Sequence, residues 1–160
     1  MHHTHKKIFL VFHKIKIVCY DIYMNEIWKP ITQIKRNGKI LEFRGYEISN
    51  LGRVRSYKYK YGQVRAGNER PLLSKPYEIF GRKEKNKGYM LLCLSDVNKK
   101  RYNIRIHTAV MQTFVGFPDD GMVICHKNDI KTDNRLENLY YGTQKDNGLD
   151  RVRNRKLNAS

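Results

Sequence analysis

The chain has 160 residues, and its 32 Lys and Arg against 15 Asp and Glu give a formal net charge of +17. This length suits one compact domain with an appendage, because domains commonly run to about 100–150 residues. With 29% charged residues and no run near the roughly 18 apolar residues that a spanning helix needs, the composition excludes an integral membrane protein. The 11 Tyr and 6 Phe supply material for a core and exclude a wholly disordered basic tail.

The surplus of positive charge predicts a polyanionic partner, because so large a self-repulsion opposes a compact fold until something neutralises it. Nucleic acid is the leading candidate, and an anionic membrane surface comes second because no long basic amphipathic helix supports it. Residues 1–118 hold 24 Lys and Arg against 8 Asp and Glu, whereas residues 119–150 hold 4 against 7. The basic part suits a polyanion and the acidic part suits a hard cation, although chance clustering of solvated charges explains the same pattern.

Three cysteines, Cys19, Cys93 and Cys125, are widely spaced and form no CxxC pair. Their odd number and spacing disfavour a disulfide scaffold or a zinc ribbon, and predict a reducing compartment, the cytoplasm, rather than secretion. Residues 1–23 also lack the long apolar core and the cleavage site of a secretory signal. We interpret them as an extension, either a short strand or translated upstream sequence ahead of a functional start at Met24.

Two hairpins separated by a basic loop are predicted next. Tyr46, Ile48 and Val54 alternate with polar residues around a turn at residues 50–52, which predicts the first hairpin. Residues 63–87 are rich in Gly, Arg and Lys and predict the loop. Residues 88–106 return to a strand pattern with a polar turn near residues 96–100, and predict the second hairpin.

The first hairpin carries cations that can meet a phosphate backbone. They are Arg53, Arg55, Lys58 and Lys60. The same pattern fits an ordinary small sheet with a solvated face, and the charge balance of the whole chain is what favours a contact with nucleic acid.

The C-terminal part predicts a helix and then a unit of strand, loop, strand and helix. Residues 107–114 carry apolar side chains at helical spacing and predict a short core helix. Residues 122–126 predict a buried strand, and residues 138–141 predict a returning strand after a polar loop. Thr143 can cap a helix that continues to about Val152.

The last unit places His126 at the end of its first strand, Asn138 at the start of the second and Asn147 inside the helix. A neutral imidazole takes a proton from water near pH 7, and a helix-borne amide oxygen ligates a hard divalent cation. A third polar side chain can hold the imidazole by hydrogen bonding. Together these groups suffice for metal-assisted hydrolysis of a phosphodiester. Taken singly, each is also typical of a structural histidine or of an Asn that bonds its own backbone.

Two stretches of the chain resemble parts of one known family. The first contains Trp28, Ile31, residues 45–50 and residues 52–54; the second contains His107, Ala109, Phe114, residues 123–129, Asp133, Asn134, residues 137–143, Asp146 and Asn147. The second stretch resembles the HNH endonucleases of the ββα-metal (His-Me finger) type, most of all the homing endonucleases of bacteriophages and mobile introns. The first resembles the DNA-binding module that those enzymes carry ahead of the nuclease.

This resemblance implies an α+β fold, in which a β-hairpin-rich DNA-binding region precedes a ββα-metal HNH nuclease motif. We therefore divide the chain in sequence order. The predicted parts are the extension at residues 1–23, the DNA-binding module at 24–62, the basic loop at 63–87, the nuclease domain at 88–152 and a basic tail at 153–160.

Carried over to this sequence, the resemblance implies His126 as the general base and Asn138 as the Asn that steadies the hairpin and the base. Asn147 is implied as a ligand of a single divalent ion, magnesium or manganese. Arg105 joins the expected DNA contacts, and His107 is expected to be structural or to contact phosphate rather than to act as the base. The expected partner is double-stranded DNA, bound by a monomer.

One position departs from the family pattern. The residue before the base is often an Asp or His that ligates the metal, but here it is Cys125, and a soft, usually protonated thiol matches magnesium poorly. Cys125 is therefore a doubtful ligand. Three interpretations follow. Another oxygen, from water, Asp129 or Asp146, completes the coordination shell of the metal; the site binds a softer metal; or catalysis is lost. The first interpretation is preferred because hard cations keep several waters and need few protein ligands.

Three functions thus stay open. The first is a metal-dependent DNA endonuclease of the HNH homing type, and the second is a DNA-binding protein with a degenerate nuclease site. The third is a structural zinc protein using Cys93, Cys125, His107 and His126, whose spacing fits no standard finger, so zinc is not expected.

Overall fold

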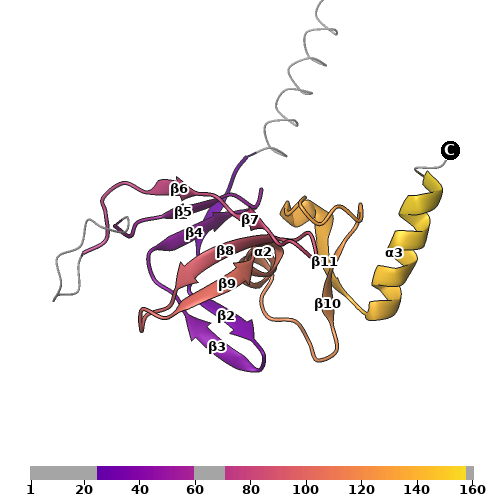
Figure 1. The fold of residues 1–160 in the computed structure, drawn as a ribbon, viewed down its shortest axis with the longest axis horizontal. Helices are drawn as coiled ribbons and strands as arrows, with labels where there is room; N and C mark the ends of the chain where they lie inside the picture. Colours follow the sequence, from indigo (N-terminus) through magenta and orange to yellow (C-terminus); the bar gives the residue numbers. More distant parts are fainter. Residues whose placement is uncertain (1–24, 60–70, 158–160) are drawn as a thin grey trace, which may run out of the picture.

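The structure, a computed structural model, describes residues 25–59 and 71–157. The predicted extension at residues 1–23 and the cation Lys60 lie outside these ranges. Within them the fold is a set of small antiparallel sheets around one short helix, followed by a hairpin and a longer helix at one side of the molecule (Figure 1). The predicted α+β class is confirmed.

The first sheet has four strands. In spatial order they are β1 (Trp28–Pro30), β4 (Tyr46–Ser49), β5 (Val54–Ser56) and β6 (Tyr77–Ile79). Tyr46 and Ile48 of β4 and Val54 of β5 are buried, and Ile48 lies opposite Val54. This alternation predicted the first hairpin, which is confirmed.

A second, three-stranded sheet follows. It contains β7 (Arg82–Lys83), β8 (Met90–Ser95) and β9 (Arg101–Arg105). The β8–β9 pair confirms the second predicted hairpin. The described part of the predicted basic loop therefore holds two short strands, β6 and β7. The two side chains of β7 are exposed and polar, so backbone pairing with β8 forms that strand without an apolar pattern. In β6 the half-buried Tyr77 and Ile79 flank the exposed Glu78, and the strand pairs with β5.

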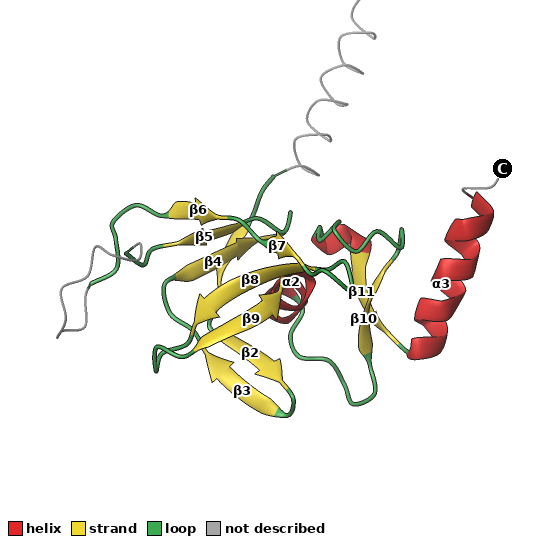
Figure 2. Cartoon of the chain, in the orientation of Figure 1, coloured by secondary structure: helices red, strands yellow, loops and turns green. Residues whose placement is uncertain are grey.

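Another hairpin, β2 (Gln33–Arg36) and β3 (Lys39–Glu42), was not predicted. The helix α2 (Ile106–Phe114) confirms the predicted core helix and lies behind β8 and β9 in the view of Figure 2. It packs against β2, β4, β8 and β9. Val110 and Met111 of α2 meet Ile34 and Ile48 in one buried cluster.

The C-terminal unit follows α2. It consists of β10 (Val123–His126), a 3₁₀ turn (Leu136–Asn138), β11 (Leu139–Gly142) and α3 (Gln144–Leu157). Both predicted strands and the predicted helix are confirmed. The helix is longer than predicted, because residues 153–157 of the expected basic tail continue it. No helix in the described part of the chain is long and apolar enough to cross a membrane.

Candidate active site

The β10–β11 hairpin and α3 form one strand–strand–helix unit. Backbone pairing sets Cys125 opposite Tyr140. At the start of α3 the Thr143 hydroxyl accepts a hydrogen bond from the Asp146 N–H at 3.2 Å, and Asp146 Oδ2 accepts one from the Thr143 N–H at 2.8 Å. This reciprocal cap fixes where the helix begins, and α3 packs across both strands of the hairpin. The predicted capping role of Thr143 is confirmed.

His126 ends β10 and faces α2 rather than α3. Its side chain is buried, with 6% of the residue exposed, and its ring centroid lies 5.2 Å from that of His107 and 6.1 Å from that of Tyr89. Burial lowers the pKa of His126, although the Asn134 side chain and the carboxylate of Asp133 act in the opposite direction. The imidazole is therefore mainly unprotonated at neutral pH, which is the form that a general base needs.

Asn138 ties the loop after β10 across the hairpin. Its Oδ1 accepts a hydrogen bond from the Asn128 N–H at 3.2 Å, and its Nδ2 donates to Asn128 Oδ1 and to the Asp133 carbonyl, both at 2.9 Å. Its own carbonyl accepts from the Lys127 N–H at 2.9 Å. A side chain with these partners holds the loop that follows His126, which is what the steadying role predicted for Asn138 requires.

Asn147 lies near the start of α3, three residues before Asp150. Residues three apart share a helix face, and Asp150 is turned to the hairpin because its carboxylate accepts a hydrogen bond from the Tyr140 hydroxyl. Its other oxygen pairs with Arg153 at 2.8 Å. Asn147 therefore shares the α3 face that meets Tyr140, whereas the His126 ring packs against His107 of α2. The expected cleft shared by His126 and Asn147 stays a prediction.

Cys125 is fully buried on the α3 side of the hairpin. Burial raises the pKa of its thiol, and the nearby charges of Asp150 and Asp146 raise it further, so a protonated sulfur faces the helix. A Cβ placed on Gly142 would lie 2.8 Å from Tyr140 Cε2 and 3.3 Å from both Cys125 Sγ and Asp146 Cβ. Glycine therefore lets the strand pack closely against the first turn of α3 beside Cys125.

The oxygen donors in the first turn of α3, next to Cys125, fit a hard divalent cation. The Thr143 hydrogen bonds lower the pKa of Asp146, so its carboxylate is ionised, and Asn147 adds an amide oxygen from the same turn. Hard cations accept such a small oxygen set because water fills the remaining positions. Within residues 25–59 and 71–157 no group of three or more His, Cys, Asp or Glu side chains gathers for a metal. The protonated Cys125 thiol does not suit such an ion.

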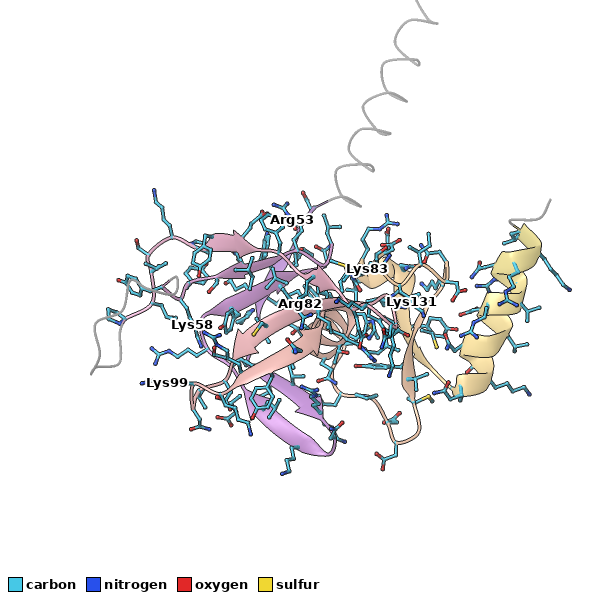
Figure 3. All side chains as sticks on the ribbon, viewed as in Figure 1. Arg53, Lys58, Arg82, Lys83, Lys99 and Lys131 are labelled. Atoms are coloured by element: carbon cyan, nitrogen blue, oxygen red, sulfur yellow. The ribbon has the colours of Figure 1, made fainter. Side chains whose placement is uncertain are left out.

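Basic side chains surround Tyr89, whose ring meets His107 edge to face at 4.8 Å. The Arg105 guanidinium lies 4.5 Å from the centre of the Tyr89 ring, and Lys131 Nζ lies 5.1 Å from it. Lys83 and Lys131 both approach the neighbouring Gly88, and Figure 3 shows them where β7 meets the hairpin. We call Lys83, Arg105 and Lys131 the basic rim, because they lie around the aromatic cluster that contains His126.

Most of the basic side chains predicted to contact DNA from the first hairpin interact with other residues of the protein. Arg53 pairs with Glu26 at 2.7 Å and also with Glu78. Arg55 pairs with Glu47 at 2.5 Å, and its guanidinium lies 4.1 Å from the centre of the Trp28 ring.

Lys58 Nζ donates to the Ser95 carbonyl at 3.0 Å. Arg105 has a longer contact of 3.4 Å with Glu84. The pairing of Arg53 and Arg55 with carboxylates reduces the charge that they offer to phosphate, and explains these two side chains as parts of the sheet.

His107 does not lie on a DNA-facing surface. It is 5% exposed, and burial, with the charges of His126 and Arg105, lowers its pKa to about 3. Burial and the lowered pKa disfavour the predicted phosphate contact of His107, which stays a prediction, and the structural alternative agrees with its packing between Tyr89 and His126.

Four residues near the site were missed by sequence reasoning, namely Lys83, Tyr89, Lys131 and Asn134. Lys83 and Lys131 belong to stretches predicted as basic or polar loops, where many residues are charged and charge alone does not identify a functional one. Tyr89 belonged to a predicted strand, and only the packing of α2 against β8 brings it to His107. Asn134 belonged to the quoted family pattern, but no sequence signal indicated its partner.

Comparison with known proteins agrees with this geometry. Residues 105–149 match the family model of the HNH endonuclease, and residues 26–95 match that of the NUMOD4 motif. The two matches confirm the family resemblance and the order of the two parts.

Among solved structures, the HNH homing endonuclease I-HmuI, studied for its DNA binding and cleavage, is similar to this chain with a TM-score of 0.54 and 26% sequence identity. The similarity covers 79% of this chain and 57% of that one, so the chain spans little more than half the length of that enzyme. No curated protein gives a significant match.

Proposed function

Because the chain carries an HNH endonuclease domain behind a NUMOD4 motif, we propose that it is a metal-dependent endonuclease of the homing type. Its substrate is double-stranded DNA, which it hydrolyses as a monomer in the cytoplasm. The observation that carries the proposal is a buried, unprotonated His126 at the end of β10, beside the basic rim of Lys83, Arg105 and Lys131.

In this mechanism His126 accepts the proton of the attacking water. Its lowered pKa keeps the imidazole free of a proton at neutral pH, and the Asn138 hydrogen bonds keep the end of β10 in place while the proton moves. The basic rim neutralises the phosphates that flank the scissile bond and so brings the duplex to the base.

Asn147 and Asp146 would hold the divalent cation, which we propose to be magnesium or manganese. When bound, such an ion supplies Lewis-acid stabilisation of the charge that develops on the scissile phosphate. Both residues lie in the first turn of α3, where the Thr143 cap fixes the backbone. Cys125 takes no part in this step.

A second function, a DNA-binding protein with a degenerate nuclease site, is favoured by Cys125 alone. The buried thiol stands where related enzymes often have a metal ligand, and its pKa is raised rather than lowered. In that case the basic side chains bind DNA but the backbone stays intact.

Incubation of supercoiled plasmid with the protein separates the two functions. We expect conversion to nicked or linear DNA with magnesium or manganese, and none with EDTA, because hydrolysis needs the cation and binding does not. The reaction is followed on agarose gels, with a gel-shift assay in EDTA to show that the protein binds DNA. Intact plasmid under all metal conditions, despite a shift, would favour the degenerate site.

The basic rim predicts how affinity depends on salt. Replacing Lys131 and Lys83 together by Gln should make the slope of log K against log salt shallower by about 1.8, because each lost phosphate contact removes about 0.9. The measurement is a titration of a duplex by fluorescence anisotropy at several salt concentrations.

Lys99→Gln serves as the matched control. Lys99 lies at the turn between β8 and β9, well away from Lys83 and Lys131 in Figure 3, so removing its charge should leave the slope unchanged. Equal slopes for the control and the Lys83 and Lys131 double variant would mean that the rim does not bind phosphate.

A further inference from the structure

Three buried polar atoms around the base have no hydrogen-bond partner in the described part of the chain: His126 Nε2, His107 Nδ1 and Asn134 Oδ1. Buried polar atoms of folded proteins nearly always have a hydrogen-bond partner, so these three atoms indicate a site where a further hydrogen bond can form. The Asn134 oxygen can only accept, whereas an imidazole nitrogen donates or accepts according to its tautomer. A hydrogen bond from His126 Nε2–H to Asn134 Oδ1 would satisfy two of the three atoms at once.

Asn134 is already placed to act on the base. It is 6% exposed, and its side chain favours the protonated form of His126, against the effect of burial on that pKa. His107 instead meets His126 as a packing partner, with an angle of 71° between the two rings. A proton held on Nε2 leaves the lone pair of Nδ1 free to take a proton from water.

Asn134 is also in contact with the preceding module. A Cβ added to Gly52, in the turn between β4 and β5, would lie 3.0 Å from both Cβ and the carbonyl oxygen of Asn134. Two residues further on, the Leu136 N–H donates to the Asn50 carbonyl at 2.7 Å. On the nuclease side Asn134 Nδ2 donates to the Thr132 carbonyl at 3.0 Å. The asparagine is thus held between the two family-matched parts of the chain.

We propose that Asn134 is the positioning residue of the general base, accepting a hydrogen bond from His126 Nε2, and that the turn at residues 50–52 holds Asn134 in place. This inference rests on the proposed endonuclease function. It gives the contact between the two modules a role in catalysis, because displacement of the turn displaces the residue that sets the tautomer of His126.

The side-chain oxygen is tested with Asn134→Leu and Asn134→Asp, which are close to Asn in size. Leu removes both the oxygen and the bond to the Thr132 carbonyl, whereas Asp keeps an acceptor for His126, loses that bond and adds a negative charge beside the imidazole. Under single-turnover conditions with supercoiled plasmid and magnesium, Asn134→Leu should cut about 100-fold more slowly, the scale of a misplaced catalytic group. Asn134→Asp should retain most of the wild-type rate, with affinity for DNA in EDTA unchanged in both. Equal losses in Leu and Asp would assign Asn134 a structural role through Thr132 and overturn the proposal.

The module contact is tested with Gly52→Ala against Gly121→Ala. Both glycines have a positive φ, +78° and +81°, but a Cβ meets Asn134 at Gly52 and nothing within 4 Å at Gly121. Backbone strain is therefore matched, and only Gly52→Ala should slow cleavage, by about 10-fold or more, at unchanged DNA affinity. Equal cleavage by the two variants would overturn the role of the turn. A wild-type protein that leaves plasmid intact would instead refute the endonuclease function itself.

Discussion

Replacing His126 by alanine should lower the rate of plasmid cleavage by about 10²–10⁴-fold, the usual contribution of a positioned general base. The affinity for DNA should change by less than about 2-fold, because phosphate contacts supply most of it and a residue that is 6% exposed contributes little surface. Single-turnover cleavage with magnesium measures the first quantity, and a gel shift in EDTA measures the second. Cutting at the wild-type rate by His126→Ala would remove this residue from the mechanism.

Loss of packing has to be separated from loss of the base in that experiment. The His126 ring packs against His107 and Tyr89, so alanine leaves a cavity there that lowers stability. Added imidazole can occupy the cavity and return a proton acceptor, and should restore part of the cleavage by His126→Ala. His126→Leu fills the same space without a nitrogen and should gain nothing from imidazole. Equal responses of the two variants would show that the original loss was structural.

The sequence predicted the hairpin–helix unit closely because its signals are local. The apolar run at residues 122–125, the Thr143 cap and the polar loop between the strands depend on neighbours within a few residues. The β2–β3 hairpin, which was not predicted, carries an equally local signal. Asn37 and Gly38, with φ of 49° and 74°, form an Asn-Gly turn, which is typical of two-residue hairpin loops.

The surroundings of the base could not be predicted in the same way. Tyr89 precedes β8, His107 lies in α2 and His126 ends β10, and the packing of α2 against β8 and β10 brings their rings together. The charge pattern offered no means of separating free cations from paired ones. Arg53 and Arg55 looked available in the sequence, but Glu26, Glu47 and Glu78 lie within reach in the fold.

The expected result of Cys125→Asp is a protein whose stability depends on divalent cations. Cys125 is fully buried beside Asp146 and Asp150, so a carboxylate there meets two like charges and loses its water. We expect this substitution to lower the free energy of unfolding by roughly 2–4 kcal/mol in EDTA, as uncompensated buried charges do. A cation held by the introduced carboxylate together with Asn147 would return about 2.7 kcal/mol at a concentration 100 times its Kd.

Thermal unfolding with EDTA and with increasing magnesium or manganese measures this linkage, and Cys125→Asn is the matched control. Asn has the size of Asp without its charge, so its unfolding temperature should respond to the cation no more than that of the wild type. Adding Asn147→Ala to Cys125→Asp should abolish the response, because the helix amide is then missing from the shell. A Cys125→Asp protein that unfolds at one temperature with or without the cation would mean that the first turn of α3 does not hold a metal next to position 125. Any cleavage by the wild type would then require an ion bound elsewhere on the chain. Cleavage by Cys125→Asp together with an inactive wild type would show that the thiol had inactivated the site.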